Sequence, residues 1–360
     1  MSRTAIRRTA VFLLGAALFA AACGSDDAPA SSADAATTTT QAAATTTQAA
    51  GTGAFPMTLD TPHGSTTLTA APQRVVALTT VDFDIALSYG VVPVAAVASV
   101  ADPNAADEHL RARLAELEAV TGQSVEVWLD AYFTDDVNVE LLATTRPDLI
   151  LATSDWSLGD HYESLASLAP VAGYTVQNGP EVQPWTEKAR IIAQAFGTPD
   201  LADDVIAEVD EMFAQAREEH PQFAGVSLTY AVVFPPAEDV SFLSATGAVD
   251  DDFFEALGFA PSPNADQFGP SYPDNLLSLE RLDLLDADLL VLGMHEGLSE
   301  AERNTIIAMP LFQAIPAVAD GRSVVLPEGH SSNIVYPAPL LLRAELDVIL
   351  PVLEEVLPAA

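Results

Sequence analysis

The chain has 360 residues, of which 49% are hydrophobic, and its 51 acidic residues outweigh 14 basic ones to give a formal net charge of −37. So much negative charge repels the phosphate backbone, which excludes nucleic acid as a partner. Cys23 is the single cysteine, so an intramolecular disulfide is also excluded. The apolar content is sufficient for two cores of ordinary size.

The N-terminus has the pattern of a secretory signal peptide over residues 1–22. Three arginines precede an apolar run that is too short to span a bilayer. Cys23 follows "FAAA", which resembles a bacterial lipobox, although Ala20 stands where leucine is usual. The resemblance implies cleavage before Cys23, lipidation of its sulfur and anchoring at the extracytoplasmic face of the cell membrane. A plain cleaved signal with an incidental cysteine is the alternative.

Residues 23–54 form a low-complexity stretch of Ala, Thr, Ser and Gln with little to bury, which predicts a disordered tether. No later segment is long and apolar enough to predict a transmembrane helix. Loss of residues 1–22 removes three arginines and changes the formal charge from −37 to −40. We therefore expect the membrane to be contacted through the lipid anchor only.

The folded part begins near residue 55 with strand and helix patterns in alternation. "RVVALTTVDFDIALSYGVVPVAAVA" predicts a strand, a helix ending at Gly90 and a second strand after Pro93. "DLILAT", "SLTYAVVF", "ADLLVLG" and "SVVLP" predict further strands. This alternation predicts an α/β fold with parallel-rich sheets.

One unit of this pattern occurs twice. "VNVELLATTRPDLILAT" aligns without a gap on "LLSLERLDLLDADLLVLG", and each copy predicts a capped short helix followed by a strand. The repeat predicts two similar lobes. The matched residues are the caps Asn138 and Ser278, the glutamates Glu140 and Glu280, and the aspartates Asp148 and Asp288.

Between the two copies, residues 200–221 predict one long amphipathic helix that ends at Pro221. Its apolar stripe comprises Leu201, Val205, Ile206, Val209, Met212, Phe213 and Ala216. We expect this helix to be a rigid link between an N-terminal lobe, residues 55–199, and a C-terminal lobe, residues 222–360. A single rigid link predicts that any lobe movement is small.

The order and spacing of five segments resemble the iron-siderophore and vitamin B12 class of ABC-transporter substrate-binding lipoproteins, the class III periplasmic binding proteins. They are "PQRVVALTTVDFDIALSYGVVPVAAV", "VNVELLATTRPDLILAT", "HPQFAGVSLTYAVVF", "LSLERLDLLDADLLVLG" and "MPLFQAIPAVADGRSVVLP", and the resemblance extends from about Pro72 to Val356. "ILATSDW" and "HPQFAG" are most similar to the actinobacterial ferric-siderophore branch. The resemblance implies two Rossmann-like lobes around a ligand cleft, a monomeric carrier that is not an enzyme, and delivery to an ABC permease dimer with a cytoplasmic ATPase.

Ligands of open α/β sheets bind beyond the carboxyl ends of the strands, so residues that follow strands are the candidates for the cleft. Aromatic side chains among them suit a bulky iron chelate. For each of them, ordinary packing is the competing interpretation. The candidates are Thr80, Asp82, Phe83, Trp128, Tyr132, Asp155, Trp156, Tyr162, Phe234, Phe242, His295, His330 and Tyr336.

The predicted cleft is poor in basic residues, because Arg146 precedes a strand and Arg281 lies in a first helical turn. Siderophore binders of the family that the chain resembles often use arginines against anionic chelates, so we expect a neutral or cationic ferric chelate here, such as a hydroxamate. The six histidines show no paired metal-ligand spacing, and we expect no metal held directly by the protein and no cofactor. His295 and His330 could meet in the cleft, although a structural role is the simpler interpretation.

Glu140 and Glu280 are each explained separately by the helix macrodipole, which favours an acid in the first turn. Their repetition, one in each lobe, is not explained in that way. The resemblance implies that they engage arginines on the two permease subunits.

Three other functions are weighed against siderophore delivery. A cobalamin or haem binder would share the architecture, and a surface adhesion lipoprotein would be a carrier that has lost transport. A secreted lipid-anchored hydrolase is the most distant alternative, because "GHSSN" does not match G-x-S-x-G and "MHEGLSE" does not match H-E-x-x-H.

Overall fold

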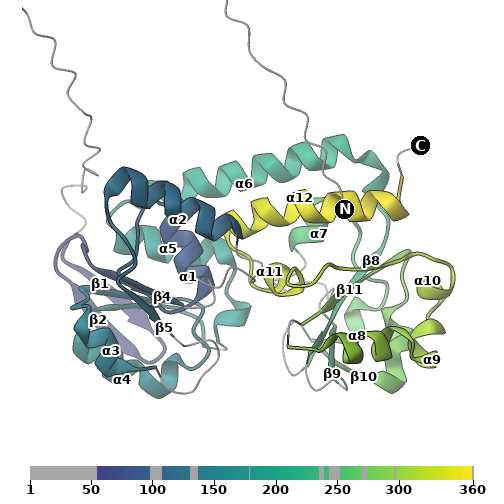
Figure 1. The fold of residues 1–360 in the computed structure, drawn as a ribbon, viewed down its shortest axis with the longest axis horizontal. Coiled ribbons are helices and arrows are strands. Elements are labelled where there is room, and N and C mark those ends of the chain that lie inside the picture. Colours follow the sequence, from purple (N-terminus) through teal and green to yellow (C-terminus); the bar gives the residue numbers. More distant parts are fainter. Residues whose placement is uncertain are drawn as a thin grey trace, which may run out of the picture. The chain divides into compact units, whose positions relative to one another are not determined.

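The computed structural model describes residues 55–97, 108–129, 137–177, 179–234, 239–242, 252–269, 274–295 and 297–358 (Figure 1). The signal peptide, Cys23 and the tether lie outside these residues. The described residues form two five-stranded sheets and one two-stranded sheet, with helices between the strands.

The first five-stranded sheet is parallel throughout and has the strand order β5-β4-β3-β6-β7. Its central strands β3, β4 and β6 confirm three strand predictions, and all their residues are buried because helices cover the sheet. Gly90 has a φ of +76° just after the first helix, where a side chain would be strained, and confirms the predicted helix end. The elements are β3 (Val75–Ala77), α1 (Thr80–Ser88), β4 (Ala95–Val97), α2 (Glu108–Thr121), β5 (Val127–Leu129), α3 (Val139–Thr144), β6 (Leu149–Ala152), α4 (Leu158–Leu168), β7 (Val171–Gly173), η2 (Pro180–Val182) and α5 (Trp185–Ala195).

A hairpin that the sequence analysis did not predict precedes this sheet. Strands β1 (Met57–Thr61) and β2 (Gly64–Leu68) pair in an antiparallel manner. The hydroxyl of Thr66 accepts a hydrogen bond from the backbone N–H of Val171, at 3.0 Å, so the hairpin is attached to β7. The hairpin therefore covers one edge of the first sheet.

The second five-stranded sheet has the order β10-β9-β8-β11-β12. Strands β8, β11 and β12 are parallel and confirm three more strand predictions, while β9 runs antiparallel to both β8 and β10. The elements are η3 (Pro221–Phe223), β8 (Leu228–Phe234), β9 (Asp239–Phe242), α7 (Asp252–Ala256), η5 (Ala265–Gln267), β10 (Leu276–Ser278), η6 (Leu279–Leu285), β11 (Leu289–Met294), α8 (Glu300–Ile307), α9 (Pro310–Gln313), α10 (Pro316–Ala319), β12 (Ser323–Val325) and α11 (Ser331–Val335).

Helix α6 (Asp200–Glu219) lies between the first half of the described chain, which ends at residue 199, and the second half, which begins at residue 220, and it confirms the long helix predicted there. Ile206, Val209 and Phe213 of its apolar stripe are buried, and Pro221 begins the next 3-10 turn. The twenty residues of α6 span about 30 Å.

A second long helix, α12 (Pro339–Val356), closes the chain and packs alongside α6 (Figure 1). Its N-terminus meets α1 of the first half, where the carboxylate of Asp84 accepts the backbone N–H of Leu340 at 3.0 Å and of Leu341 at 2.9 Å. Asp84 is fully buried. The first half of the chain thus supplies the N-terminal cap of a helix that belongs to the second half.

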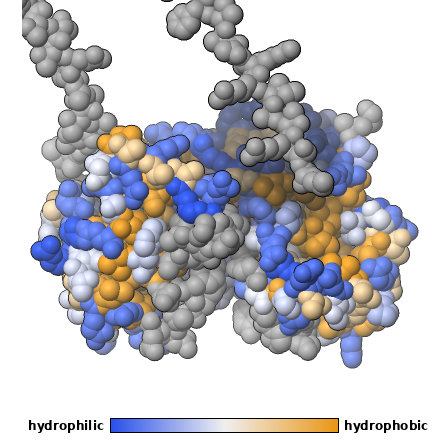
Figure 2. Space-filling model, in the orientation of Figure 1, coloured by the Kyte–Doolittle hydropathy of each residue, from blue (hydrophilic) through white to orange (hydrophobic). Residues whose placement is uncertain are grey.

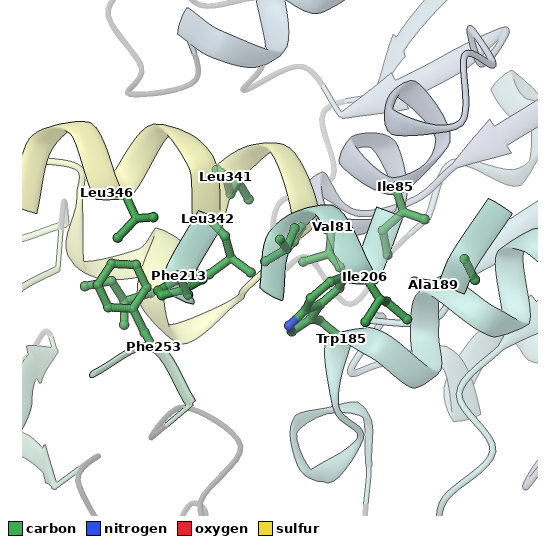
Figure 3. Close-up of a cluster of buried hydrophobic side chains, with 14 of the residues drawn as sticks. Val81, Ile85, Trp185, Ala189, Ile206, Phe213, Phe253, Leu341, Leu342 and Leu346 are labelled. Carbon is green, nitrogen blue, oxygen red and sulfur yellow. The ribbon is translucent and has the colours of Figure 1, made fainter. Parts of the chain in front are cut away.

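One hydrophobic cluster unites these helices (Figure 3). Val81 and Ile85 of α1, Trp185 of α5, Phe213 of α6 and Leu342 of α12 are all buried in it. Because this core takes side chains from both halves of the chain, the helices α1, α5, α6 and α12 pack as one layer.

Hydrophilic and hydrophobic residues are interspersed on the face drawn in Figure 2. Within the described ranges, none of the helices is both long and apolar enough to cross a membrane. Among the described residues, the large hydrophobic side chains that are strongly exposed are Val120, Trp156, Leu311 and Val325.

Candidate functional site

The repeated unit places the same aspartate at the start of a central strand in each sheet. Asp148, before β6, accepts the backbone N–H of Gln73 and of Arg74 at 2.8 Å each. Asp288, before β11, accepts the N–H of Ser227 at 3.1 Å and its hydroxyl at 2.8 Å. In both sheets the partner lies just before the neighbouring parallel strand, β3 or β8. The predicted repeat is therefore a structural repeat.

Glu140 and Glu280 occupy matching exposed positions, each nine residues before the first residue of its strand, Leu149 or Leu289. Asn138 caps α3 as predicted, because its side chain accepts the N–H of Leu141 at 2.9 Å. Ser278 makes no such side-chain bond, and η6 is a 3-10 helix in place of the short α-helix that the repeat predicts. The position of the glutamate is thus shared by both copies, whereas the helix type is not.

The carboxyl end of the first sheet contains a buried carboxylate, Asp82. Its Oδ1 accepts the N–H of Thr153 at 3.0 Å and the hydroxyl of Thr153 at 2.5 Å, while its Oδ2 accepts the hydroxyl of Thr79 at 2.7 Å. Burial raises the pKa of Asp82 to about 6, although these hydrogen bonds and the charge of Lys188 act in the opposite direction. Asp82 therefore ties the start of α1 to the end of β6.

Three candidates for the ligand cleft are corrected by their burial. Asp82 and Phe83 are 0% exposed, so neither presents surface to a ligand. Tyr162 is 6% exposed, and its ring lies against Gly64 of the hairpin, where an added Cβ would come within 2.5 Å of it. The sequence pattern located them near the strand ends, but α1 and α4 turn these side chains into the cores.

The loop between β6 and α4 presents a different arrangement. Trp156 is 42% exposed, whereas the neighbouring Asp155 is mostly enclosed and engaged in hydrogen bonds. One carboxylate oxygen of Asp155 accepts the N–H and the hydroxyl of Ser157 at 3.0 Å each, and the other lies 2.6 Å from Nε2 of His161. The indole of Trp156 is the one large apolar group that this loop exposes.

The other candidates from the first half are distributed unevenly. Thr80 begins α1 and is partly buried. Trp128, in the edge strand β5, is partly buried against the ring of Phe83, with 6.2 Å between ring centroids. Tyr132 lies outside the described residues, as does the loop that follows β4.

At the carboxyl end of the second sheet, Phe234 ends β8 and His295 follows β11. Their rings lie 5.2 Å apart. Nδ1 of His295 accepts the N–H of Gly297 at 2.9 Å. Tyr336 is partly buried against the hydrophobic cluster that contains Phe213 and Leu342. Phe242 ends β9, and its side chain lies outside what the structure describes.

His330 follows β12 and pairs with a buried carboxylate on α12. Its Nδ1 lies 3.0 Å from both oxygens of Glu345, which is 1% exposed, and the amide of Asn333 donates to the same carboxylate at 2.6 Å. Hydrogen bonding to Glu345 raises the pKa of His330. The His109 side chain on α2 is close enough to interact electrostatically with His330, and burial lowers the pKa of His109 to about 4. His330 and His295 are each engaged with their own partners.

Three structural residues were missed by sequence reasoning. Asp84 caps α12, Lys188 is a lysine buried near Asp82, and Arg303 on α8 reaches the carboxyl end of β11. The guanidinium of Arg303 donates to the backbone oxygen of Leu298 at 2.9 Å and to Glu328 at 3.0 Å. A charged residue within a mostly apolar helix, such as Asp84 in "TVDFDIALS", was the available signal. Among the described residues, no group of three His, Cys, Asp or Glu side chains could hold a metal ion.

Comparison with known proteins agrees with this architecture. A family model described as periplasmic binding protein matches residues 75–329. The Fe(3+)-citrate-binding protein YfmC of Bacillus subtilis (strain 168) is 24% identical over 262 residues, which cover 72% of this chain and 74% of that protein.

Solved structures show the same fold. A periplasmic solute binding protein from Mycobacterium smegmatis str. MC2 155 has a TM-score of 0.64 and 25% identity, covering 83% of this chain and 98% of that one. PiaA from Streptococcus pneumoniae TIGR4, in complex with ferrichrome, has a TM-score of 0.69 and 21% identity, with the same coverage of both chains. The family match spans both sheets, from the start of β3 to the loop after β12. The chain therefore belongs to the periplasmic binding protein family.

Proposed function

We propose that this protein captures a ferric siderophore outside the cytoplasmic membrane and delivers it unchanged, as a monomer, to the permease dimer of an ABC importer. The observation that carries the ligand class is the similarity to a protein named for binding Fe(3+)-citrate, which supports an iron(III) complex as cargo but not the charge of its chelator. That similarity covers 262 residues, too many to lie within either half of the chain. Structural neighbours named with ferrichrome and with Fe3+-Desferal support the same class through the shared fold.

The charges of the described residues favour a neutral or cationic chelate. Most arginines there are already paired with carboxylates, at distances within 4.0 Å. Lys188 is 6% exposed, so its ammonium is not presented to a ligand either. An anionic chelate would meet few available cations and a strongly acidic chain. We infer a ferric hydroxamate, held by aromatic contacts such as that of Trp156.

Calorimetric titration against a panel of complexes tests this inference. Ferric desferrioxamine B and ferrichrome should bind at least about tenfold more tightly than ferric citrate, haem or cobalamin, a difference of about 1.4 kcal/mol. Tight binding of ferric citrate alone would overturn the charge argument while preserving iron capture. Tight binding of haem or cobalamin alone would overturn the siderophore assignment.

Glu140 and Glu280 are proposed as the contacts with the permease. Both are exposed in the first turn of a helix, and the Asp148 and Asp288 bridges give them equivalent places in the two halves. Exposed charges of this kind set the register and the encounter rate of a complex more than its affinity. One glutamate per half matches one contact on each subunit of a permease dimer.

The double variant Glu140→Ala with Glu280→Ala should retain chelate binding and lose uptake by cells. A matched control is Glu108→Ala with Glu300→Ala, because these are also exposed glutamates in first helical turns. Uptake of iron-55 chelate should remain normal in the control. Normal uptake in the Glu140/Glu280 variant would contradict the docking assignment.

Cys23 is proposed as the lipidated residue that retains the protein at the membrane. Replacement by alanine should release the protein from cells into the medium or periplasm without changing its affinity for the chelate. Fractionation followed by immunoblotting checks this outcome, and unchanged membrane retention of Cys23→Ala would contradict it.

A further inference from the structure

The loop at residues 153–157 exposes an indole but fixes the residues on both sides of it. Trp156 is 42% exposed. Oδ1 of Asp155 accepts both the N–H and the hydroxyl of Ser157, at 3.0 Å each, which closes a turn with Trp156 at its centre. The backbone that carries the indole is therefore fixed by a side chain of the same loop.

His161 extends this arrangement into helix α4. Its Nε2 lies 2.6 Å from Oδ2 of Asp155, and both side chains are about nine-tenths enclosed. A carboxylate can only accept a hydrogen bond, so Nε2 carries the proton and donates a hydrogen bond to Oδ2 of Asp155. Nδ1 of the same ring is buried without a hydrogen-bond partner. The hydrogen bond to Asp155 thus sets the orientation of the His161 ring.

The elements on either side of the loop are rigidly packed. All four residues of β6 are buried, and Leu158 and Leu165 of α4 are 0% exposed. With both ends of the loop anchored, the orientation of Trp156 depends on the turn between them. The same alignment, continued two residues past the repeated unit, places His295 opposite Asp155, so this turn is particular to the first half.

We propose that Asp155 and His161 are positioning residues that hold the Trp156 indole in the orientation in which it contacts the chelate. This inference rests on the proposed function, because it assigns Trp156 to the ligand surface. Fixing an aromatic side chain before binding removes the entropic cost of ordering it when the ligand arrives. Loss of the turn should therefore weaken binding without removing any group that touches the ligand.

The first test needs no ligand. Acrylamide quenching of tryptophan emission is measured in the wild type and in Trp156→Phe, and the difference between them reports on Trp156. Asp155→Asn and His161→Ala should increase the quenching of Trp156 by about twofold or more, whereas His161→Gln, whose amide can still donate to Asp155, should restore it. Asp160→Asn is the matched control, because it removes an exposed acid from the same helix start. Unchanged quenching in both Asp155→Asn and His161→Ala would overturn the proposal.

The second test measures affinity for ferric desferrioxamine B by calorimetry in a double-mutant cycle. Asp155→Asn should weaken binding about five- to tenfold in the wild type and have little further effect in a Trp156→Ala background. Equal weakening in both backgrounds would show that Asp155 acts independently of Trp156 and overturn the proposal. If Asp155→Asn fails to fold, Ser157→Ala removes one bond of the turn and takes its place in both tests.

The two tests separate this inference from the proposed function. If the wild type binds none of the ferric chelates, the proposed function fails and the affinity cycle with it. The quenching experiment would still decide whether Asp155 and His161 position Trp156.

Discussion

The two copies of the repeated unit, residues 137–153 and 276–293, agree where their strands begin, but the residues that follow their strands differ. Asp148 and Asp288 both bridge to the chain just before the neighbouring parallel strand. Beyond the strands, the first copy continues into Asp155 and the exposed Trp156, whereas the second reaches His295 beside Phe234. Before the strands, both copies use an aspartate to accept hydrogen bonds from the chain that leads into the neighbouring strand. After the strands there is no such shared contact, and the residues there differ between the two halves.

Each half also buries a carboxylate, and the hydrogen-bond partners of these two carboxylates differ. The first half encloses Asp82 between Thr79 and Thr153, with hydroxyl and amide donors. The second half encloses Glu345 with His330 and Asn333. One carboxylate has neutral hydrogen-bonding partners and the other is paired with a titratable base, so the two halves should respond differently to pH.

The largest effect on stability should come from removing the contact between Asp84 and the N-terminus of α12. Asp84→Ala removes the acceptor of two N–H groups of α12, one buried and one partly buried, and should lower the free energy of unfolding by roughly 3 kcal/mol. Urea denaturation measures it. Asp347→Ala, at an exposed position of the same helix, should change stability by less than about 0.5 kcal/mol. Equal stability of the two variants would show that the capping contact does not hold the halves together.

A comparable effect should appear as pH dependence at Asp82. Its folded pKa of about 6 lies above its unfolded value, so its contribution is complete below pH 3.8 and is lost as pH rises through 6. The stability of the wild type relative to Asp82→Asn should therefore fall by about 3 kcal/mol between pH 3 and pH 7. Urea denaturation of both proteins at several pH values checks this. A constant difference would contradict the burial of an ionisable carboxyl at this site.

The repeated bridges should matter less and can be compared directly. Asp148→Ala removes an acceptor from two backbone N–H groups and should destabilise by about 1 to 2 kcal/mol. Asp288→Ala loses one backbone and one hydroxyl donor and should cost about 1 kcal/mol. Thermal denaturation of both variants tests whether the copies are energetically alike. A large effect of Asp288→Ala with none for Asp148→Ala would show that the two bridges do not stabilise the two halves in the same way.

The smallest effect should be at His330 and should have its own pH window. The pKa of His330 is raised by Glu345, so its stabilising contribution is complete below pH 6.5 and is lost as pH rises through the raised folded value. The stability of the wild type relative to His330→Gln should therefore be greater at pH 6 than at pH 9. Thermal denaturation at these two pH values measures the difference, and Glu345→Gln should remove the same pH dependence.

The sequence predicted where the candidate site lies better than it predicted which side chains line it. Trp156 was singled out because it follows a strand, and the structure does expose it. Asp82, Phe83 and Tyr162 were singled out on the same ground and are buried. Position after a strand places a residue at one end of the sheet, but the direction of its side chain depends on the helix that follows. The role of His161, one turn into α4, had no sequence signal of its own.

The sequence by itself determined the six main strands, the long α6 helix, the two-fold repeat and the α/β class, because these depend on local periodicity and on the spacing of like segments. It did not reveal the β1–β2 hairpin or the place of α12. Only the tertiary structure decided that Asp84 caps a helix more than 250 residues away and that His330 meets Glu345. Such contacts depend on which faces of distant helices are buried together, and a periodic pattern shows that a face is apolar without showing what it packs against.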